Sequence, residues 1–117
     1  MRANLCVATG TSVLLLASLL PALSDDVPVI NVDPVCRGIA QQAGSVSEKG
    51  APDLRFSQCV KSEQAIRDKL AKEWSTFTAA DKGNCVGEEK SGPLPSYTDL
   101  ITCLEMARDV REMNAKK

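Results

Sequence analysis

The cysteines are the residues whose type and spacing most clearly define a chemistry in this chain. The sequence has five, and Cys6 falls within an apolar N-terminal stretch, which leaves Cys36, Cys59, Cys85 and Cys103. No two of these form a Cys-x-x-Cys motif, so the spacing of a dithiol redox site or a zinc knuckle is excluded. An even number of cysteines in a short exported chain predicts two structural disulfides, with three possible pairings.

The expected order of the helices favours pairing Cys36 with Cys59 and Cys85 with Cys103. Each of these bonds joins consecutive elements, whereas Cys59 and Cys103 would lie far apart on antiparallel helices. Closing a loop of about 24 residues contributes roughly 3 kcal/mol in the chain-entropy model. Because the chain has one Trp, one Tyr and two Phe for its core, the two disulfides are expected to supply much of its net stability.

A carboxylate within an apolar stripe is the second chemical feature of the sequence. Apolar residues recur at helical spacing over residues 57–77 and predict one apolar stripe: Cys59, Ile66, Leu70, Trp74 and Phe77. Glu63 falls within this stripe, where an unpaired charge would cost several kcal/mol, so its carboxylate should have a partner or stay partly exposed to water. With the long helices antiparallel, Arg108 and Arg111 of the last helix would lie nearby. We therefore predict a structural ion pair of Glu63 with Arg111 or Arg108, the alternative being a polar ligand site there.

The composition excludes several classes of function. There is no histidine, which removes Ser-His-Asp and Cys-His catalysis and His-ligated zinc. With 14 Lys and Arg against 15 Asp and Glu, the chain lacks the positive field that nucleic acids require. Glu88 and Glu89 lie outside any calcium-loop motif, and Trp74 and Tyr97 suit the core and its edge. We expect no catalytic residue, no cofactor, no metal and no enzymatic activity.

The N-terminal 24 residues have the features of a secretory signal. Arg2 precedes an apolar stretch at 13–20, and small residues at Ala22 and Ser24 favour cleavage before Asp25. An uncleaved anchor helix is the alternative, but polar residues interrupt the apolar stretch, which is short for a span. We expect a periplasmic or secreted protein that has no membrane span after cleavage.

Capping signals divide the mature chain into helices. Residues 25–35 contain two prolines and are expected to form an extended linker, an edge strand being the alternative. Asp33 and Pro34 signal the start of the first helix. Capping boxes at 78–81 and 96–99 begin a short helix and the last helix.

These elements predict an all-α fold. It is a small disulfide-stapled bundle of two long antiparallel helices plus two shorter helices. The four-cysteine domain would span residues 36–113, with a turn-rich loop at 86–95 and a frayed tail at 114–117.

The motifs of the mature chain resemble those of a family of small exported four-cysteine proteins of uncharacterised function from alphaproteobacteria. The resemblance covers residues 36–111, and its clearest motifs are Phe56-Ser57-Gln58-Cys59, Trp74-Ser75-Thr76-Phe77 and Ser96-Tyr97-Thr98-Asp99-Leu100. It implies a periplasmic helical protein and no particular activity. The Cys59-x-x-x-Glu63 run is also similar, more loosely, to periplasmic lysozyme-inhibitor-like domains, from which this chain departs in its few aromatic residues.

Three classes of function follow from the sequence. The first is a small binding or interaction module that presents a helical face or the 86–95 loop to a protein partner, which would leave an apolar patch exposed. The second is a structural or stress-related envelope protein that lacks a pocket. The third, an enzyme, would need polar groups clustered in a concavity, and the sequence offers only Glu63 with its possible partners Arg108 and Arg111. The partner and the oligomeric state are not specified by the sequence.

Overall fold

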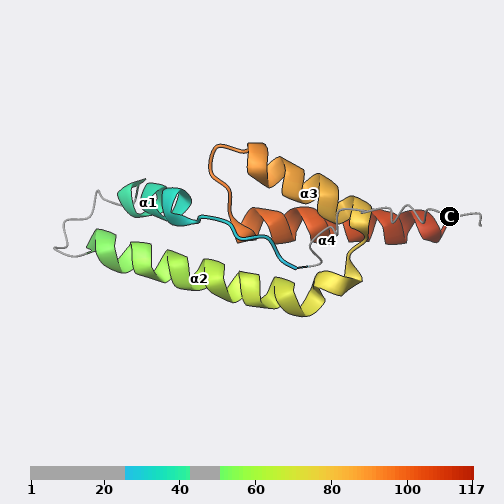
Figure 1. The fold of residues 1–117 in the computed structure, drawn as a ribbon, viewed down its shortest axis with the longest axis horizontal. Helices are drawn as coiled ribbons and strands as arrows, with labels where there is room; N and C mark the ends of the chain where they lie inside the picture. Colours follow the sequence, from blue (N-terminus) through green and yellow to red (C-terminus); the bar gives the residue numbers. More distant parts are fainter. Residues whose placement is uncertain (1–25, 43–50) are drawn as a thin grey trace, which may run out of the picture.

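The computed structural model describes residues 26–42 and 51–117, with Ala51 described by its backbone alone. The expected signal at 1–24, including Cys6, lies outside the described residues. The described part contains helices and no strand, as predicted: α1 (Asp33–Gln42), α2 (Ala51–Glu73), the short 3-10 helix η1 (Trp74–Thr76), α3 (Ala79–Ser91) and α4 (Tyr97–Ala115) (Figure 1). None of the helices described is both long and apolar enough to cross a membrane.

Helices α1, α3 and α4 start where the sequence predicted them. Helix α1 opens with Asp33 and Pro34, an acidic residue followed by a fixed backbone angle that suits a first turn. The hydroxyl of Thr78 accepts a hydrogen bond from the backbone N of Asp81 at 3.1 Å. The hydroxyl of Ser96 accepts one from the backbone N of Asp99 at 3.0 Å. Both predicted N-caps are therefore confirmed.

Two helices are longer than the sequence indicated. Helix α2 begins at Ala51 rather than near residue 57, because Pro52 is tolerated in a first turn. Helix α3 continues to Ser91 through much of the expected 86–95 loop, so Gly87 is accommodated inside it. The helix ends where the backbone N of Gly92 donates to the carbonyl of Glu88 at 2.9 Å.

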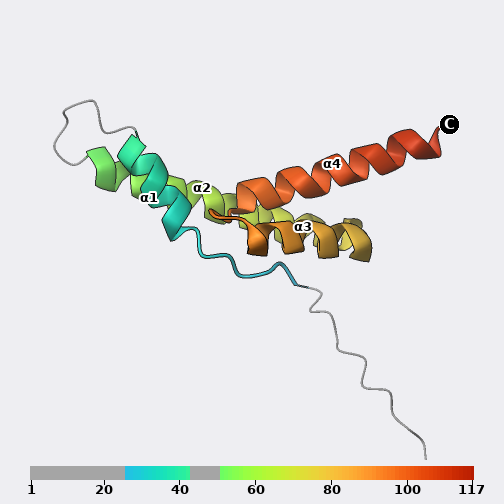
Figure 2. The ribbon, with the colours of Figure 1, turned by 90° about the horizontal axis from the view of Figure 1, so that it is seen from above.

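The two long helices run parallel, in contrast to the predicted antiparallel arrangement. Glu63 of α2 contacts Tyr97, the first residue of α4. Further along both helices, Lys69 Nζ lies 2.7 Å from Glu105 Oε1. Helix α3, which lies between the two in the sequence, runs in the opposite direction to both (Figures 1 and 2). The length of α3 is the physical reason for the difference, because a helix of 13 residues carries the chain back along the bundle.

The core lies where α2, α3 and α4 meet the extended segment 26–32. Its buried side chains come from these four segments, from η1 and from the residue after η1: Val27, Leu70, Trp74, Phe77, Cys85, Tyr97, Leu100, Ile101 and Leu104. The Tyr97 hydroxyl accepts from the backbone N of Ile30 at 2.9 Å and donates to the carbonyl of Pro28 at 3.2 Å. The predicted linker is therefore extended, but it is packed on the core rather than free.

The predicted cysteine pairing is confirmed. Cys36 of α1 is bonded to Cys59 of α2, with a Cα–Cα distance of 5.5 Å. Cys85 of α3 is bonded to Cys103 of α4, with a Cα–Cα distance of 5.8 Å. Each disulfide thus joins two neighbouring helices.

Candidate functional site

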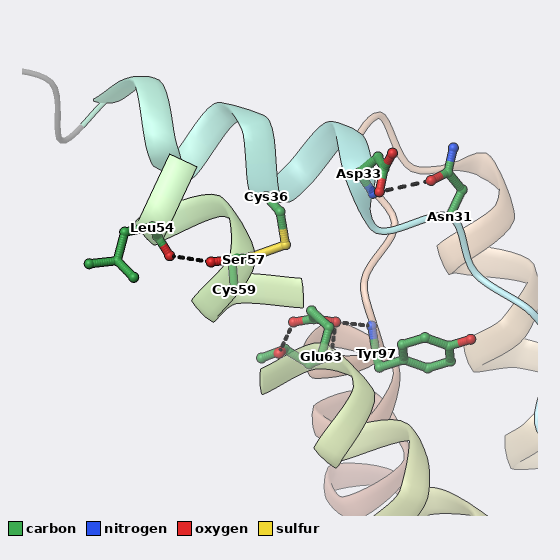
Figure 3. Close-up of a disulfide and its surroundings, with 9 residues drawn as sticks. Asn31, Asp33, Cys36, Leu54, Ser57, Cys59, Glu63 and Tyr97 are labelled. Atoms are coloured by element: carbon green, nitrogen blue, oxygen red, sulfur yellow. Dashed lines mark hydrogen bonds between the residues drawn. A yellow bond between two sulfur atoms is a disulfide. The ribbon is translucent and has the colours of Figure 1, made fainter. Parts of the chain in front are cut away.

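Glu63 is buried, and its carboxylate meets the N-terminus of α4 (Figure 3). Its Oε2 atom accepts hydrogen bonds from the backbone N of Tyr97 at 2.6 Å and of Thr98 at 3.3 Å. The Thr98 hydroxyl donates to Oε1. Unpaired N–H groups and the helix dipole favour an anion at this position. The first turn of α4 therefore satisfies the buried charge.

The predicted ion pair of Glu63 with Arg108 or Arg111 is wrong. Arg108 Nη1 lies 3.5 Å from Glu73 Oε2, and Arg111 pairs with Asp81. Because α2 and α4 are parallel, both arginines lie beside the end of α2 and the start of α3, away from Glu63. The polar ligand site considered for that pair consequently has no arginine beside the carboxylate.

One residue in each of two ion pairs between helices has a shifted pKa. The hydrogen bond from the Thr78 hydroxyl, reinforced by Arg111, lowers the pKa of Asp81 below its ordinary value of 3.8. The hydrogen bond to Glu105 raises the pKa of Lys69 above 10.5. Both shifts favour the charged forms, and both pairs join different helices. They are structural ties between elements.

An open groove of about 910 Å³ lies between α2, α3 and residues 26–29. No Cα of α2 lies within 8 Å of a Cα of α3 in the part of the chain described. Helix α4 contacts both helices, and the extended segment follows the gap between them (Figure 1). We call this feature the α2–α3 groove, and it is lined by Asp26, Val27, Pro28, Val29, Arg67, Ala71, Trp74, Ala79, Lys82, Gly83, Val86, Gly87 and Lys90.

Small residues keep the α3 side of the groove open. Ala79, Gly83 and Gly87 are spaced by four on α3 and all line the groove. A Cβ atom added at Gly83 or Gly87 would meet nothing within 4 Å, so no close packing requires glycine there. Each glycine inside a helix costs about 0.8–1.0 kcal/mol relative to alanine. The helix therefore gives up stability at two positions, and the space left there belongs to the groove.

Trp74 forms part of both the core and the groove. It is the chain's single Trp, is 5% exposed, and has Lys82 Nζ 5.0 Å from its ring centroid. Its indole N–H has no acceptor among the described residues. The prediction that Trp74 belongs to the core is confirmed, but the groove beside it was not predicted from the sequence. The spacing of Gly83 and Gly87 was the available signal, because on a helix it places both on one face.

A second apolar surface lies on α4. Met106, Val110 and Met113 are each more than half exposed, and their spacing places them on one face. They lie between the middle of α4 and its C-terminal end, the end that projects beyond α2 and α3 in Figure 2. We call these three residues the α4 ridge. It matches the exposed apolar patch that the sequence associates with an interaction module.

The acidic pair in α3 has structural contacts. Glu89 Oε2 accepts from the backbone N of Ser96 at 3.0 Å and so fixes the turn into α4. Glu88 Oε2 lies 3.6 Å from the Sγ atom of Cys103. Within residues 26–42 and 51–117, no group of three or more Cys, Asp or Glu side chains is arranged to hold a metal ion.

Comparisons with known proteins found no relative: no protein-family model matches the chain, and searches of curated proteins and of solved structures gave no match. A function therefore has to be inferred from the geometry of the chain itself.

Proposed function

We propose that the protein is exported, loses residues 1–24, and acts outside the cytoplasm as a small non-catalytic binding module whose ligand occupies the α2–α3 groove. The observation that carries this proposal is the groove itself, an open space of about 910 Å³ beside a closed core. The signal-like N-terminus and the resemblance to small exported four-cysteine proteins support export. Two disulfides are compatible with an oxidising compartment.

The groove lining argues for binding rather than catalysis. Among the described residues, its side chains include one carboxylate, that of Asp26, and no hydroxyl or thiol. Acid–base catalysis requires paired groups that face one substrate, and Ser or Cys nucleophiles require an adjacent base. Apolar side chains with a few polar groups are instead typical of ligand-binding pockets.

Protein interaction through the α4 ridge is the second candidate function. The exposed positions of Met106, Val110 and Met113 favour it, because apolar patches on small proteins often mark contact surfaces. A structural envelope role or inhibition of a lysozyme-like enzyme would leave the groove without a ligand.

Export can be tested on the protein produced from the full chain in a bacterial host. Mass spectrometry of the periplasmic fraction should find a chain that begins at Asp25 and has Cys36, Cys59, Cys85 and Cys103 oxidised. An intact N-terminus, or free thiols at these positions, would contradict the export proposal.

Groove binding can be tested on the same material with the neutral fluorescent probe phenylnaphthylamine. Binding should change Trp74 fluorescence, because Trp74 lines the groove. The double variant Gly83→Leu, Gly87→Leu should lose binding, since its new side chains project into open space. Gly38→Leu is the matched control, because Gly38 is also helical and unobstructed but lies outside the groove. Equal binding by the filled variant and the control would exclude the groove as the site.

A further inference from the structure

The charges around the α2–α3 groove are strongly one-sided. Arg67 from α2 and Lys82 and Lys90 from α3 line it, and Asp26 is the acidic residue among the described residues of the lining. The chain as a whole has a formal net charge of −1. A positively charged cleft on a protein with a negative net charge attracts anions to the cleft rather than to the rest of the surface.

The cations are spread along the groove, with apolar and small residues between them. Lys82 and Lys90 are separated by two turns of α3, about 12 Å along the axis, and Gly83, Val86 and Gly87 lie between them in the lining. Beyond Lys90 the surface continues into a smaller hollow of about 120 Å³, which Glu89 also lines; the Glu89 carboxylate accepts a hydrogen bond from the backbone N of Ser96. An elongated molecule would therefore contact apolar surface along its length and a cation near its end.

Apolar surface is exposed beside these cations. Val29 is 90% exposed and lines both the groove and the smaller hollow, as do Pro28 and Val86. An inorganic anion would leave this apolar surface in water, whereas a neutral apolar molecule would place no charge near Arg67 and Lys90. A molecule with both an apolar body and an anionic head uses both features.

We propose that the ligand of the α2–α3 groove is an anionic amphiphile, a small molecule with an elongated or aromatic apolar body and one carboxylate or sulfonate head. This inference rests on the proposed binding function and adds the chemical class of the ligand. Arg67 and Lys90 contact the head, and Val29, Trp74 and Val86 contact the body. Lys82, placed over the Trp74 ring, adds to the positive potential.

A pair of matched probes distinguishes recognition of the anionic head from recognition of the apolar body. Anilinonaphthalene sulfonate and phenylnaphthylamine share one ring system and differ by the sulfonate. On the periplasmic, oxidised protein, the sulfonate probe should bind about fivefold more tightly, and added salt should reduce this preference. Energy transfer from Trp74 reports binding in the groove. Decanoate should displace the sulfonate probe, whereas decyltrimethylammonium should not.

Charge-neutralising variants test which residues recognise the head. Arg67→Gln with Lys90→Gln should weaken the sulfonate probe about fivefold and leave phenylnaphthylamine within about twofold. Lys61→Gln with Lys72→Gln is the control, because both lysines are exposed on α2 and lie outside the groove. Cooperative thermal unfolding of each variant shows that a lost signal is not lost folding.

The outcomes distinguish this inference from the function on which it depends. Equal affinity for the two probes, unaffected by Arg67→Gln and Lys90→Gln, would refute the anionic head and leave the groove as a site for neutral ligands. Binding of neither probe by the wild-type protein would refute both proposals. Sulfonate binding that persists in Gly83→Leu, Gly87→Leu would place the anion elsewhere and refute the inference.

Discussion

The two disulfides lie in very different surroundings. Cys85 is 1% exposed and belongs to the core cluster, against which Cys103 also packs. Cys36 and Cys59 instead join α1 to the first half of α2 (Figure 3). Along α1, Cys36 and Ala40 are the buried residues, and Ile39 is half exposed. One bond belongs to the core cluster, and the other lies in a separate interface between α1 and α2, where Cys36 and Ala40 are buried.

This difference shows that the same covalent link can have two physical roles. A helix of 10 residues is marginal in water without tertiary packing, so α1 depends on its interface with α2 and on the crosslink within that interface. Helices α2, α3 and α4 contribute to one core cluster, which includes Leu100 and Leu104 of α4. This packing contributes stability whether or not the Cys85–Cys103 bond is present. The first disulfide should therefore control a local equilibrium, and the second should control global stability.

Removing each disulfide in turn is expected to have the largest effect on stability. Cys85→Ala with Cys103→Ala should lower the global free energy of unfolding by about 3 kcal/mol, because the unfolded chain gains the freedom of an open loop. Cys36→Ala with Cys59→Ala should abolish hydrogen-exchange protection in α1 and change the protection of α4 by less than about 1 kcal/mol. Denaturant titration and amide exchange measure the two effects.

Matched substitutions show whether packing explains the contrast between these regions. Leu104→Ala, at a fully buried position, should cost about 2–5 kcal/mol, whereas Ile39→Ala should cost less than about 1 kcal/mol. If loss of the Cys36–Cys59 bond unfolded all helices together, α1 would be part of the core, and the two regions would not differ.

Glu63 connects the two regions, and its loss should have an intermediate effect. It lies one turn after Cys59 and binds the first turn of α4. Glu63→Gln replaces a charged acceptor by a neutral amide and should cost about 1–2 kcal/mol in global stability. Thermal unfolding measures the change, and Ser62→Ala, at the exposed neighbouring position, is the control. An unchanged melting temperature would mean that α4 does not need this anion.

Local signals in the sequence predicted much of this fold. The Thr78 and Ser96 caps, the helical start at Asp33 and the place of Glu63 on the apolar face of its helix each depend on short-range spacing, and the structure has all of them. The disulfide pairing followed from the rule that consecutive elements lie together. Local chemistry is readable because few residues decide it.

The orientation of the helices could not be predicted in the same way. Gly87 was interpreted as part of a loop, but its cost inside a helix is about 1 kcal/mol, and the contacts of α3 with α4 outweigh it. The lengthened α3 makes α2 and α4 parallel, and the partner of Glu63 changes from an arginine to a helix N-terminus. The groove requires three segments from distant parts of the chain, which no local pattern brings together.

The smallest expected effect is a pH dependence confined to the core region. The pKa of Asp81 is lowered in the folded protein by the Thr78 hydroxyl and by Arg111. A depressed pKa contributes stability above the pKa of the unfolded chain, and this contribution is lost as the pH falls through the folded value. The melting temperature of the wild type should exceed that of Asp81→Asn at neutral pH, and the difference should shrink below the ordinary carboxyl pKa of 3.8.

The control for this titration is Asp109→Asn, at an exposed position on α4, which should show no comparable dependence. Exchange protection of α1 should be the same in wild type and Asp81→Asn at every pH, because Asp81 contacts α4 and not α1. A difference that stayed constant down to about pH 2 would mean that Asp81 acts through a neutral contact. Altered protection of α1 would instead show that the two regions are coupled. Protonation of Asp81 at the start of α3 would then change the stability of α1 through the contact of Glu63 with α4.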